Sequence, residues 1–460
     1  MIIGYLSFAI AAFVLAFTIK LGRKTLHHLA IKSVALLNAM LIQTDEDTHI
    51  KNVEHATKNL FSALLKTIAL FALAIVLASI PSVILFAASV EIYEEVSIQS
   101  LYGILSLSIG ASLPFLIPSK KNKTTSYSEL QQLLHHLVLD NFEIGKKLFQ
   151  IERKRYSTLP DHDAQQFVIV SGLARAGTTS LMNKLATLES FATLSYANMP
   201  LLMAPNLWSK IYQPKSNKTK ERSHKDGIEI GLNSNEALEE YFFKVITNNR
   251  FICENKLNTH ALSIEEYREY IAYQSVVRKQ PSEIYLAKNN NFLLRYLSIR
   301  EFNPSFVMVI MFRDPLTHAS SLLDKHISFS KLQTEDPFVL DYMNWLGHHE
   351  FGLNHIPFDF GNNNELSSLS KNSIDYWLCV WIIYYEYALS AKHKNTVYIC
   401  YEEYCQNPIK AIGTVFEKLN LNAPFLEAEA FNNKRTSNLK CNPILIERAQ
   451  KLYAQLTSLA

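Results

Sequence analysis

The sequence predicts a three-layer α/β fold with a central, mostly parallel sheet, preceded by an N-terminal helical transmembrane region. The α/β part is predicted because short apolar runs alternate with helical patterns after residue 161, and two of these runs lead into segments that contain an arginine. The transmembrane region is predicted by three long uncharged stretches within the first 119 residues. These features divide the 460 residues between a membrane region and an α/β domain.

The composition narrows the classes of protein that fit the chain. Apolar residues make up 48% of the sequence, which is ample for a core, and the net charge of +3 with no basic tail gives no indication of a nucleic-acid partner. The five cysteines form no CxxC pair, which indicates a reducing compartment rather than a disulfide framework or a zinc site. They are Cys253, Cys379, Cys400, Cys405 and Cys441.

The three uncharged stretches have the lengths and flanking charges of membrane spans. The first, 2–19, lies in the predicted transmembrane helix 1–24. The others, 67–90 and 96–119, are predicted to be transmembrane helices 2 and 3, joined by a short acidic outer loop within 67–119. Basic residues follow the first and third stretches, which favours a retained anchor over a cleaved signal peptide. The positive-inside rule then places the N-terminus outside and the C-terminal domain in the cytoplasm. A buried helical hairpin is the alternative for 67–119.

Two segments of mixed composition adjoin the spans. Residues 25–66 have helical spacing interrupted by three acidic residues, 45–47, which predicts a pair of amphipathic helices on the cytoplasmic side. They would lie on the membrane or pack against the spans or the enzyme domain. Residues 120–160 are predicted to be a linker followed by one amphipathic helix with apolar positions from 130 to 148. The basic stretch 146–155 either lies near anionic headgroups or is a solvated face.

The most informative stretch lies at the start of the α/β domain. Apolar residues 167–170 predict a buried strand, 171–177 a tight loop, and Thr178 the first residue of a helix. A strand, loop and helix in this order bind phosphate, because unpaired N–H groups and the positive end of the helix dipole converge on one point. Gly172 and Gly177 have the spacing of the nucleotide-binding P-loop, so a P-loop-type fold is predicted.

The loop departs from the P-loop of kinases and ATPases at the lysine position. Thr178 occupies that position, Thr179 follows it, and the cation comes earlier, from Arg175. A kinase needs the lysine to reach the β- and γ-phosphates. Two hydroxyls, one guanidinium and the backbone amides from Ala176 onward instead predict a site for one phosphate or phosphosulfate. An ordinary strand–turn–helix is the alternative.

A second apolar run, 306–312, predicts another central strand. Arg313 follows directly as part of Arg-Asp-Pro, and Ser321 lies on the next predicted helix. Ligands of open α/β sheets bind at the carboxyl ends of the strands, so Arg175 and Arg313 can bind two separate anionic groups of one nucleotide. Two further strands are predicted at 284–287 and 397–401.

These motifs resemble those of the sulfotransferase superfamily, in particular a bacterial membrane-anchored branch. The loop Gly172-x-x-Arg175-x-Gly177-Thr178-Thr179 is similar to the 5′-phosphosulfate loop of that family, and Arg313-Asp-Pro315 with Ser321 is similar to its 3′-phosphate motif. The resemblance extends over about residues 165–445 and includes segments 196–200, 204–208, 236–240, 288–291, 345–352 and 401–408. It implies that a domain over 161–460 transfers a sulfonate group from 3′-phosphoadenosine 5′-phosphosulfate (PAPS) to an acceptor hydroxyl, without a metal.

The resemblance also implies roles for individual residues. Arg313 and Ser321 would bind the 3′-phosphate, and Lys288 would stabilise the sulfonate during transfer. The family histidine that acts as the base corresponds to Asn290, which cannot accept a proton, so the identity of the base stays open. The candidates are, in order, Glu240 with Glu236 and the neighbouring Glu239 on one predicted helix, then His224, then the segment His348-His349-Glu350.

Together the spans and the resemblance predict an enzyme at the cytoplasmic face of a bacterial inner membrane. Its acceptor would be a glycan, a glycolipid or another membrane-associated molecule, with the lipid bilayer as a partner. Two other classes stay open. A P-loop kinase-like phosphotransferase would need a lysine at Thr178 and a carboxylate for magnesium, and a non-catalytic nucleotide-binding membrane protein would be expected to lose Arg175 or Arg313. The oligomeric state is not predicted.

Overall fold

The structure is a computed structural model that describes residues 2–41, 45–89, 91–92, 96–117, 128–157, 166–212, 220–221, 229–230, 237–361, 365–422, 430 and 439–460. The chain forms two compact units, Met1–Asn141 (unit 1) and Phe142–Ala460 (unit 2). The single amphipathic helix expected over 130–148 is two helices, α6 and α7, one in each unit. The α/β unit therefore begins before the expected boundary at residue 161.

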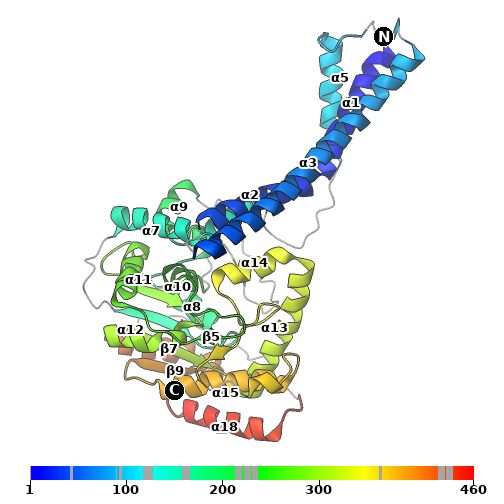
Figure 1. Cartoon of the computed structure of the whole chain (residues 1–460). Coiled ribbons are helices and arrows are strands. Elements are labelled where there is room, and N and C mark those ends of the chain that lie inside the picture. Colours follow the sequence, from blue (N-terminus) through cyan, green and yellow to red (C-terminus); the bar gives the residue numbers. More distant parts are fainter. Residues whose placement is uncertain are drawn as a thin grey trace. The chain divides into compact units, whose positions relative to one another are not determined.

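Unit 1 consists of helices over its described residues. They are α1 (Ile2–Leu21), α2 (Arg23–Leu41), α3 (Glu46–Ala88), α5 (Leu101–Leu116) and α6 (Glu129–Leu139). Helix α1 packs against α3 and α5, and α2 packs against α3 and α6 (Figure 1). The acidic residues at 45–47 begin a helix, as Asp45 caps α3 by accepting a hydrogen bond from the Thr48 amide at 3.0 Å.

Helix α3 corrects the expected division between residues 66 and 67. Its 43 residues form one continuous helix that contains both the second expected amphipathic helix and most of the second apolar stretch. At 1.5 Å per residue it is about 65 Å long, roughly twice the thickness of a bilayer core. Within the described residues, the third apolar stretch is helical over α5, and the Ser100 side chain caps the N-terminus of this helix by accepting from the Gly103 amide.

Contacts within unit 1 define the relative directions of its apolar helices. The Tyr5 and Ser100 hydroxyls lie 3.0 Å apart near the N-terminal ends of α1 and α5. The Lys20 ammonium, near the C-terminal end of α1, donates to the carbonyls of Pro114 and Ile117 at 2.7 and 2.6 Å. Helices α1 and α5 are therefore parallel, which is the relation that a first and a third span must have.

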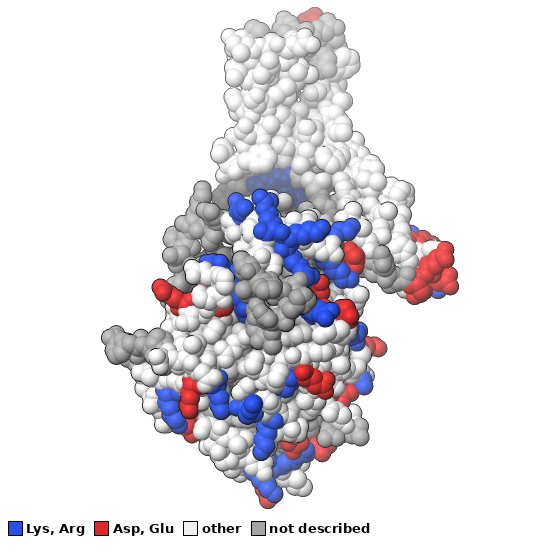
Figure 2. All heavy atoms as spheres, turned by 90° about the vertical axis from the view of Figure 1, so that its left-hand side faces the viewer, with Lys and Arg blue, Asp and Glu red and all other residues white. Residues whose placement is uncertain are grey.

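The apolar side chains of these helices face outward. Helices α1 and α3 are both long and apolar enough to cross a membrane, and most of their apolar stretches are not buried; Ile75 and Ile84 of α3, for example, are 62% and 61% exposed. The part of the surface that these helices form has very few charged side chains (Figure 2). An apolar surface of this extent is unusual in a soluble protein and is typical of membrane association.

Unit 2 contains the α/β domain. Its larger elements are α7 (Phe142–Tyr156), β1 (Phe167–Ser171), α8 (Thr178–Ala186), β2 (Phe191–Ala192), α9 (Pro205–Ile211), α10 (Glu240–Thr247), α11 (Ile264–Val277), β6 (Ile284–Lys288), α12 (Tyr296–Phe302), β7 (Val307–Phe312), α13 (Pro315–Glu335), α14 (Pro337–Leu346), α15 (Ile374–Ser390), β9 (Thr396–Cys400), α16 (Tyr401–Gln406), α17 (Pro408–Lys418) and α18 (Pro443–Thr457). Short strands are β3 (Lys220–Glu221), β4 (Glu229–Ile230), β5 (Leu257–Asn258) and β8 (Phe358–Asp359), and the 3₁₀ turns are η1 (Tyr196–Asn198), η2 (Phe292–Leu294) and η3 (Leu366–Ser368).

The central sheet confirms the prediction of a parallel α/β core. Its five strands have the order β2-β6-β1-β7-β9, and every neighbouring pair is parallel. The four predicted strands are all present within one residue of their expected ends, whereas the two-residue edge strand β2 was not predicted. Because β1 lies between β6 and β7, the carboxyl ends of these three strands meet at one edge.

Both faces of the sheet are covered. Helices α8 and α17 pack on one face, where Leu181 and Phe416 join the buried strand residues in one apolar cluster. Aromatic rings dominate the other face: Phe167 of β1 stacks on Phe306 with ring centroids 4.7 Å apart and meets Tyr270 of α11 edge to face. This burial holds the strands rigidly and leaves their carboxyl ends to present side chains.

Candidate active site

The loop after β1 has the backbone conformation of an anion-binding turn. Gly172, Arg175 and Gly177 all have positive φ angles, of 145°, 75° and 96°, and helix α8 begins directly after Gly177. A side chain at Gly177 would also collide with the Tyr401 ring, at 2.3 Å from its Cδ2 atom. The loop is fixed from α13 as well, because the buried His318 ring lies 2.8 Å from the Ala174 carbonyl through its Nε2 atom. The amides at the start of α8 are thus held in place for an anion.

The structure brings together the two predicted halves of the nucleotide site. The Arg175 Nε–H donates to the Ser321 hydroxyl at 3.3 Å, although 146 residues separate the two in sequence. Ser321 is fully buried on the second turn of α13, and Asp314 caps this helix by accepting from the Thr317 amide at 2.8 Å. One side chain from each motif therefore meets at the carboxyl edge of the sheet.

Arg313 is oriented by groups that follow β9. Its guanidinium lies over the Tyr401 ring, 4.6 Å from the centroid, and its Nε atom is 3.8 Å from Oε1 of Glu402. The same Glu402 oxygen accepts from the Asp314 amide at 3.2 Å. Since Tyr401 also covers Gly177, this tyrosine connects the loop to the second arginine. The ring and the carboxylate restrict the directions in which Arg313 can bind an anion.

Lys288 points at the first turn of α8. It ends β6, beside Val170 of β1, and its Nζ atom donates to the Thr179 hydroxyl at 2.8 Å. The side chain is only 5% exposed. A buried ammonium at this point is placed to interact with a negatively charged group bound by the loop.

Glu240, the first candidate for the base, has a different structural role. Its two carboxylate oxygens accept from the guanidinium of Arg295 at 2.5 and 2.8 Å, and both side chains are fully buried. Arg295 in turn lies over the Phe243 and Phe251 rings. Because both oxygens of Glu240 are occupied, another carboxylate has to be considered as the proton acceptor.

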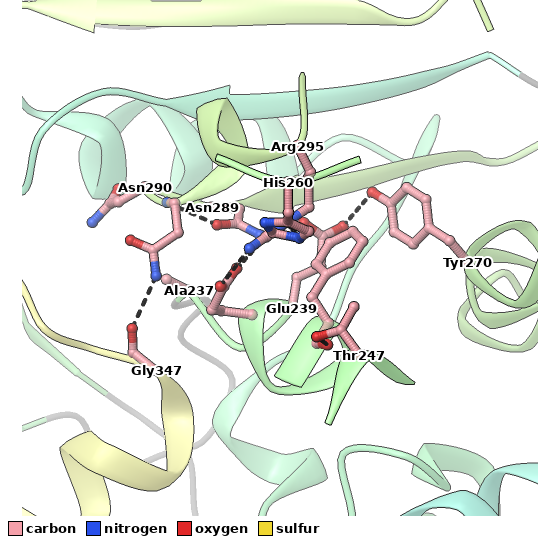
Figure 3. Close-up of polar contacts among 12 residues, drawn as sticks. Ala237, Glu239, Thr247, His260, Tyr270, Asn289, Asn290, Arg295 and Gly347 are labelled. Atoms are coloured by element: carbon pink, nitrogen blue, oxygen red, sulfur yellow. Dashed lines mark hydrogen bonds and ion pairs between the residues drawn. The ribbon is translucent and has the colours of Figure 1, made fainter. Parts of the chain in front are cut away.

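The neighbouring Glu239 supports the segment that follows Lys288. Its carboxylate accepts hydrogen bonds from the Tyr270 hydroxyl at 2.5 Å and from the Asn289 side-chain amide at 2.9 Å (Figure 3). It also accepts from the Tyr285 hydroxyl at 3.0 Å. Burial raises the pKa of Glu239 to about 7, although these hydrogen bonds and the charge of Arg295 act in the opposite direction.

We expect Glu239 to make the stability of the protein depend on pH. Its pKa is higher in the folded state than its ordinary value of 4.5, so its stabilising contribution is complete below about pH 4.5 and is lost as the pH rises through about 7. Over this interval the free energy of unfolding should fall by about 3 kcal/mol relative to a Glu239→Gln variant. Melting temperatures of both proteins from pH 4.5 to 8 provide the measurement, and parallel curves would contradict the expectation.

Of the other candidate bases, the structure describes the histidines His348 and His349, whose rings contact backbone carbonyls. Glu236 and His224 lie outside the described residues. His348 directs its Nε2 atom to the Ala237 carbonyl at 2.8 Å, and His349 directs its Nδ1 atom to the Asn354 carbonyl at 2.9 Å. Burial lowers the pKa of His349 to about 4. Within the described part of the chain, no cluster of histidine, cysteine and acidic side chains could hold a metal ion.

Several site residues could not be recognised from their local sequence. His318 fixes the loop, Tyr384 donates to the Asn290 carbonyl at 3.1 Å, and Glu402 orients Arg313. All three lie on helices that read as ordinary amphipathic or apolar segments. Of these three residues, Glu402 alone lies in a segment, 401–408, that resembles the sulfotransferase superfamily.

The fold is an α/β domain with a parallel sheet, and Arg175 and Arg313 lie in the segments that follow two of its neighbouring strands, β1 and β7. No protein-family model matches the sequence, and no curated protein matches it. The solved structures to which it is similar include the sulfotransferases STF1 from Mycobacterium tuberculosis (12% identity, TM-score 0.39, 75% of this chain and 91% of that one) and STF9 from Mycobacterium avium (11% identity, TM-score 0.36, 73% and 79%). They also include a sulfotransferase from Alicyclobacillus acidocaldarius (13% identity, TM-score 0.31, 64% and 94%). At TM-scores below 0.5 these likenesses assign neither fold nor activity, so the site has to be judged on its own residues.

Proposed function

We propose that this protein is a PAPS-dependent sulfotransferase that acts at a membrane. The observation on which this rests is the contact between Arg175 of the first loop and Ser321 of the second motif, which brings together the two segments that we propose to bind anions. A nucleotide with a phosphosulfate at one end and a separate phosphate at the other matches such a site.

The roles in the proposed site follow from the chemistry of the donor. The loop from Gly172 to Thr179 would bind the 5′-phosphosulfate through its amides, its two threonine hydroxyls and Arg175. Arg313 and Ser321 would bind the 3′-phosphate, which distinguishes PAPS from ATP. Lys288 would stabilise the negative charge that develops as the sulfonate leaves the phosphate. No metal has a part in this proposal.

The membrane part of the proposal is a three-span anchor. The parallel arrangement of α1 and α5 and their outward-facing apolar residues support a first and a third span that run in the same direction, and we place the N-terminus outside. Lys20, Arg23 and Lys24 would then lie on the cytoplasmic side, in agreement with the positive-inside rule. Unit 2 would act in the cytoplasm of a bacterium, and its acceptor would be a hydroxyl of a glycan, a glycolipid or another membrane-associated molecule.

A comparison of two nucleotides tests the donor. Adenosine 3′,5′-bisphosphate, the product left after transfer, should raise the melting temperature of the purified full chain, because a ligand that binds only the folded state stabilises it. ATP at the same concentration should have little effect. In an Arg313→Ala variant the stabilisation by the bisphosphate should be lost, as a charged hydrogen bond to phosphate contributes on the order of 2 kcal/mol.

The same titration distinguishes the alternatives. A larger rise in melting temperature with ATP than with the bisphosphate would favour a kinase-like phosphotransferase. No change in melting temperature with either nucleotide would favour a non-catalytic protein. Lys392→Ala, at an exposed turn after α15, is the matched control for the loss of a positive charge and should leave the response unchanged.

A further inference from the structure

The proposed reaction leaves one group unassigned, the base that removes the acceptor proton. Within the described residues, the carboxylates near the carboxyl edge of the sheet are largely occupied. Glu240 is bound to Arg295, Glu239 accepts from three donors, and Glu402 binds the Asp314 amide beside Arg313. Glu350 differs from them because its carboxylate accepts a hydrogen bond from Asn290, in the segment that follows Lys288.

Asn290 makes that contact. Its side-chain amide nitrogen donates to Oε1 of Glu350 at 3.0 Å, across 60 residues of sequence. Asn290 is two residues after Lys288, and its side-chain oxygen is buried without a hydrogen-bond partner among the described residues. A buried amide that donates to a carboxylate through its nitrogen and leaves its oxygen without a partner retains the capacity to accept a hydrogen bond from a hydroxyl group.

Tyr384 connects Glu350 to the phosphate-binding loop. Its hydroxyl lies 3.1 Å from the Ser171 hydroxyl at the end of β1 and donates to the Asn290 carbonyl at 3.1 Å. Burial, and to a smaller extent the charge of Glu350, raise the pKa of this tyrosine. Glu350 therefore lies close enough to act electrostatically on a group that touches the strand end beneath the loop.

The segment that contains Glu350 is fixed on both sides. Residues 347–356 connect α14 to the rest of unit 2, and Gly347 and Gly352 adopt positive φ angles within them. Side chains from other elements hold this segment. Asn291 donates to the Gly347 carbonyl at 2.9 Å, and His326 accepts from the Gly352 amide at 3.2 Å. Gln333 accepts from the Leu353 amide at 2.6 Å, and the Tyr376 hydroxyl lies 2.8 Å from Nε2 of His355. A half-buried carboxylate on so constrained a loop is preorganised rather than free to move.

We propose that Glu350 is the general base of the reaction and that Asn290 positions it. This inference rests on the proposed function. The acceptor O–H transfers its proton to a Glu350 carboxylate oxygen while the acceptor oxygen forms a bond to sulfur. The bond between sulfur and the 5′-phosphate oxygen breaks, its electron pair stays on that oxygen, and adenosine 3′,5′-bisphosphate leaves. The open oxygen of Asn290 accepts a hydrogen bond from the acceptor and directs its O–H group.

The test measures the conversion of PAPS to adenosine 3′,5′-bisphosphate by the full chain, with water or p-nitrophenol as the acceptor. Glu350→Gln should lower turnover about 100-fold, the scale of general-base catalysis, and Glu350→Asp should keep part of it. The melting shift caused by the bisphosphate should stay the same in both variants. The logarithm of the wild-type rate should rise with pH with unit slope on the acid side, and this limb should be absent in Glu350→Gln.

Two variants separate catalysis from structure. Glu301→Gln, an exposed carboxylate on α12, should behave like the wild type. Asn290→Ala should lower turnover but keep the acid limb, because it disturbs the position of the base and not the base itself. Full turnover by Glu350→Gln would overturn the proposal, and so would a wild type that binds the bisphosphate but turns over PAPS with neither acceptor. Failure of the wild type to bind the bisphosphate would instead refute the proposed function.

Discussion

Replacing Arg295 by methionine should destabilise unit 2 by about 3–5 kcal/mol, because it leaves the Glu240 carboxylate buried without its partner. Both side chains are almost completely inaccessible, and the variant lacks the two hydrogen bonds at 2.5 and 2.8 Å. The variant also loses the contacts of the guanidinium with the Phe243 and Phe251 rings. The thermal unfolding of purified protein, followed by intrinsic fluorescence, provides the measurement.

A double variant distinguishes the unpaired charge from the loss of packing. In Glu240→Leu/Arg295→Met both charges are absent and the volume is approximately kept, so most of the lost stability should return. Arg268→Met, an exposed arginine on α11, is the control and should change stability by less than about 0.5 kcal/mol. A double variant as unstable as Arg295→Met would mean that shape, and not charge, dominates at this position.

The parts of the candidate site that depend on local sequence patterns were predictable from the sequence. The loop after β1 was predictable because its signal is local: an apolar run, two glycines at a fixed spacing and a helix follow one another within a few residues. The pairing of Arg313 with the same edge of the sheet was predictable for a related reason, since parallel strands place their carboxyl ends together.

The roles of the acidic residues were not predictable because they depend on partners far away in sequence. Arg295 is 55 residues from Glu240, and Asn290 is 60 residues from Glu350. Helical spacing placed Glu236 and Glu240 on one face, but it could not show that Glu240 meets a buried arginine. The end of the second amphipathic helix was misplaced for a physical reason as well, because α3 changes from polar to apolar near residue 66 with no proline or glycine at that point.

Replacing Lys288 by methionine should lower PAPS turnover by a factor of about 100–1000, the cost of removing one preorganised group that stabilises developing charge. The side chain is 95% buried, so its charge acts in a medium where little water screens it. Adenosine 3′,5′-bisphosphate lacks the sulfonate, and its effect on the melting temperature should therefore change little. Measuring both quantities separates a role in transfer from a role in donor binding.

Lys288→Met also removes the hydrogen bond to the Thr179 hydroxyl, and this loss alone is an alternative explanation for a slower reaction. A matched variant at Thr179 separates the two effects. Thr179→Val removes the hydroxyl and leaves the ammonium in place. If Lys288 served only to hold Thr179, the two variants would lose turnover equally. If it stabilises the sulfonate, Lys288→Met should be at least 10-fold slower than Thr179→Val, and Lys288→Arg should recover part of the rate because it restores the positive charge with a different shape. Turnover of Lys288→Met within twofold of the wild type would remove this residue from the mechanism.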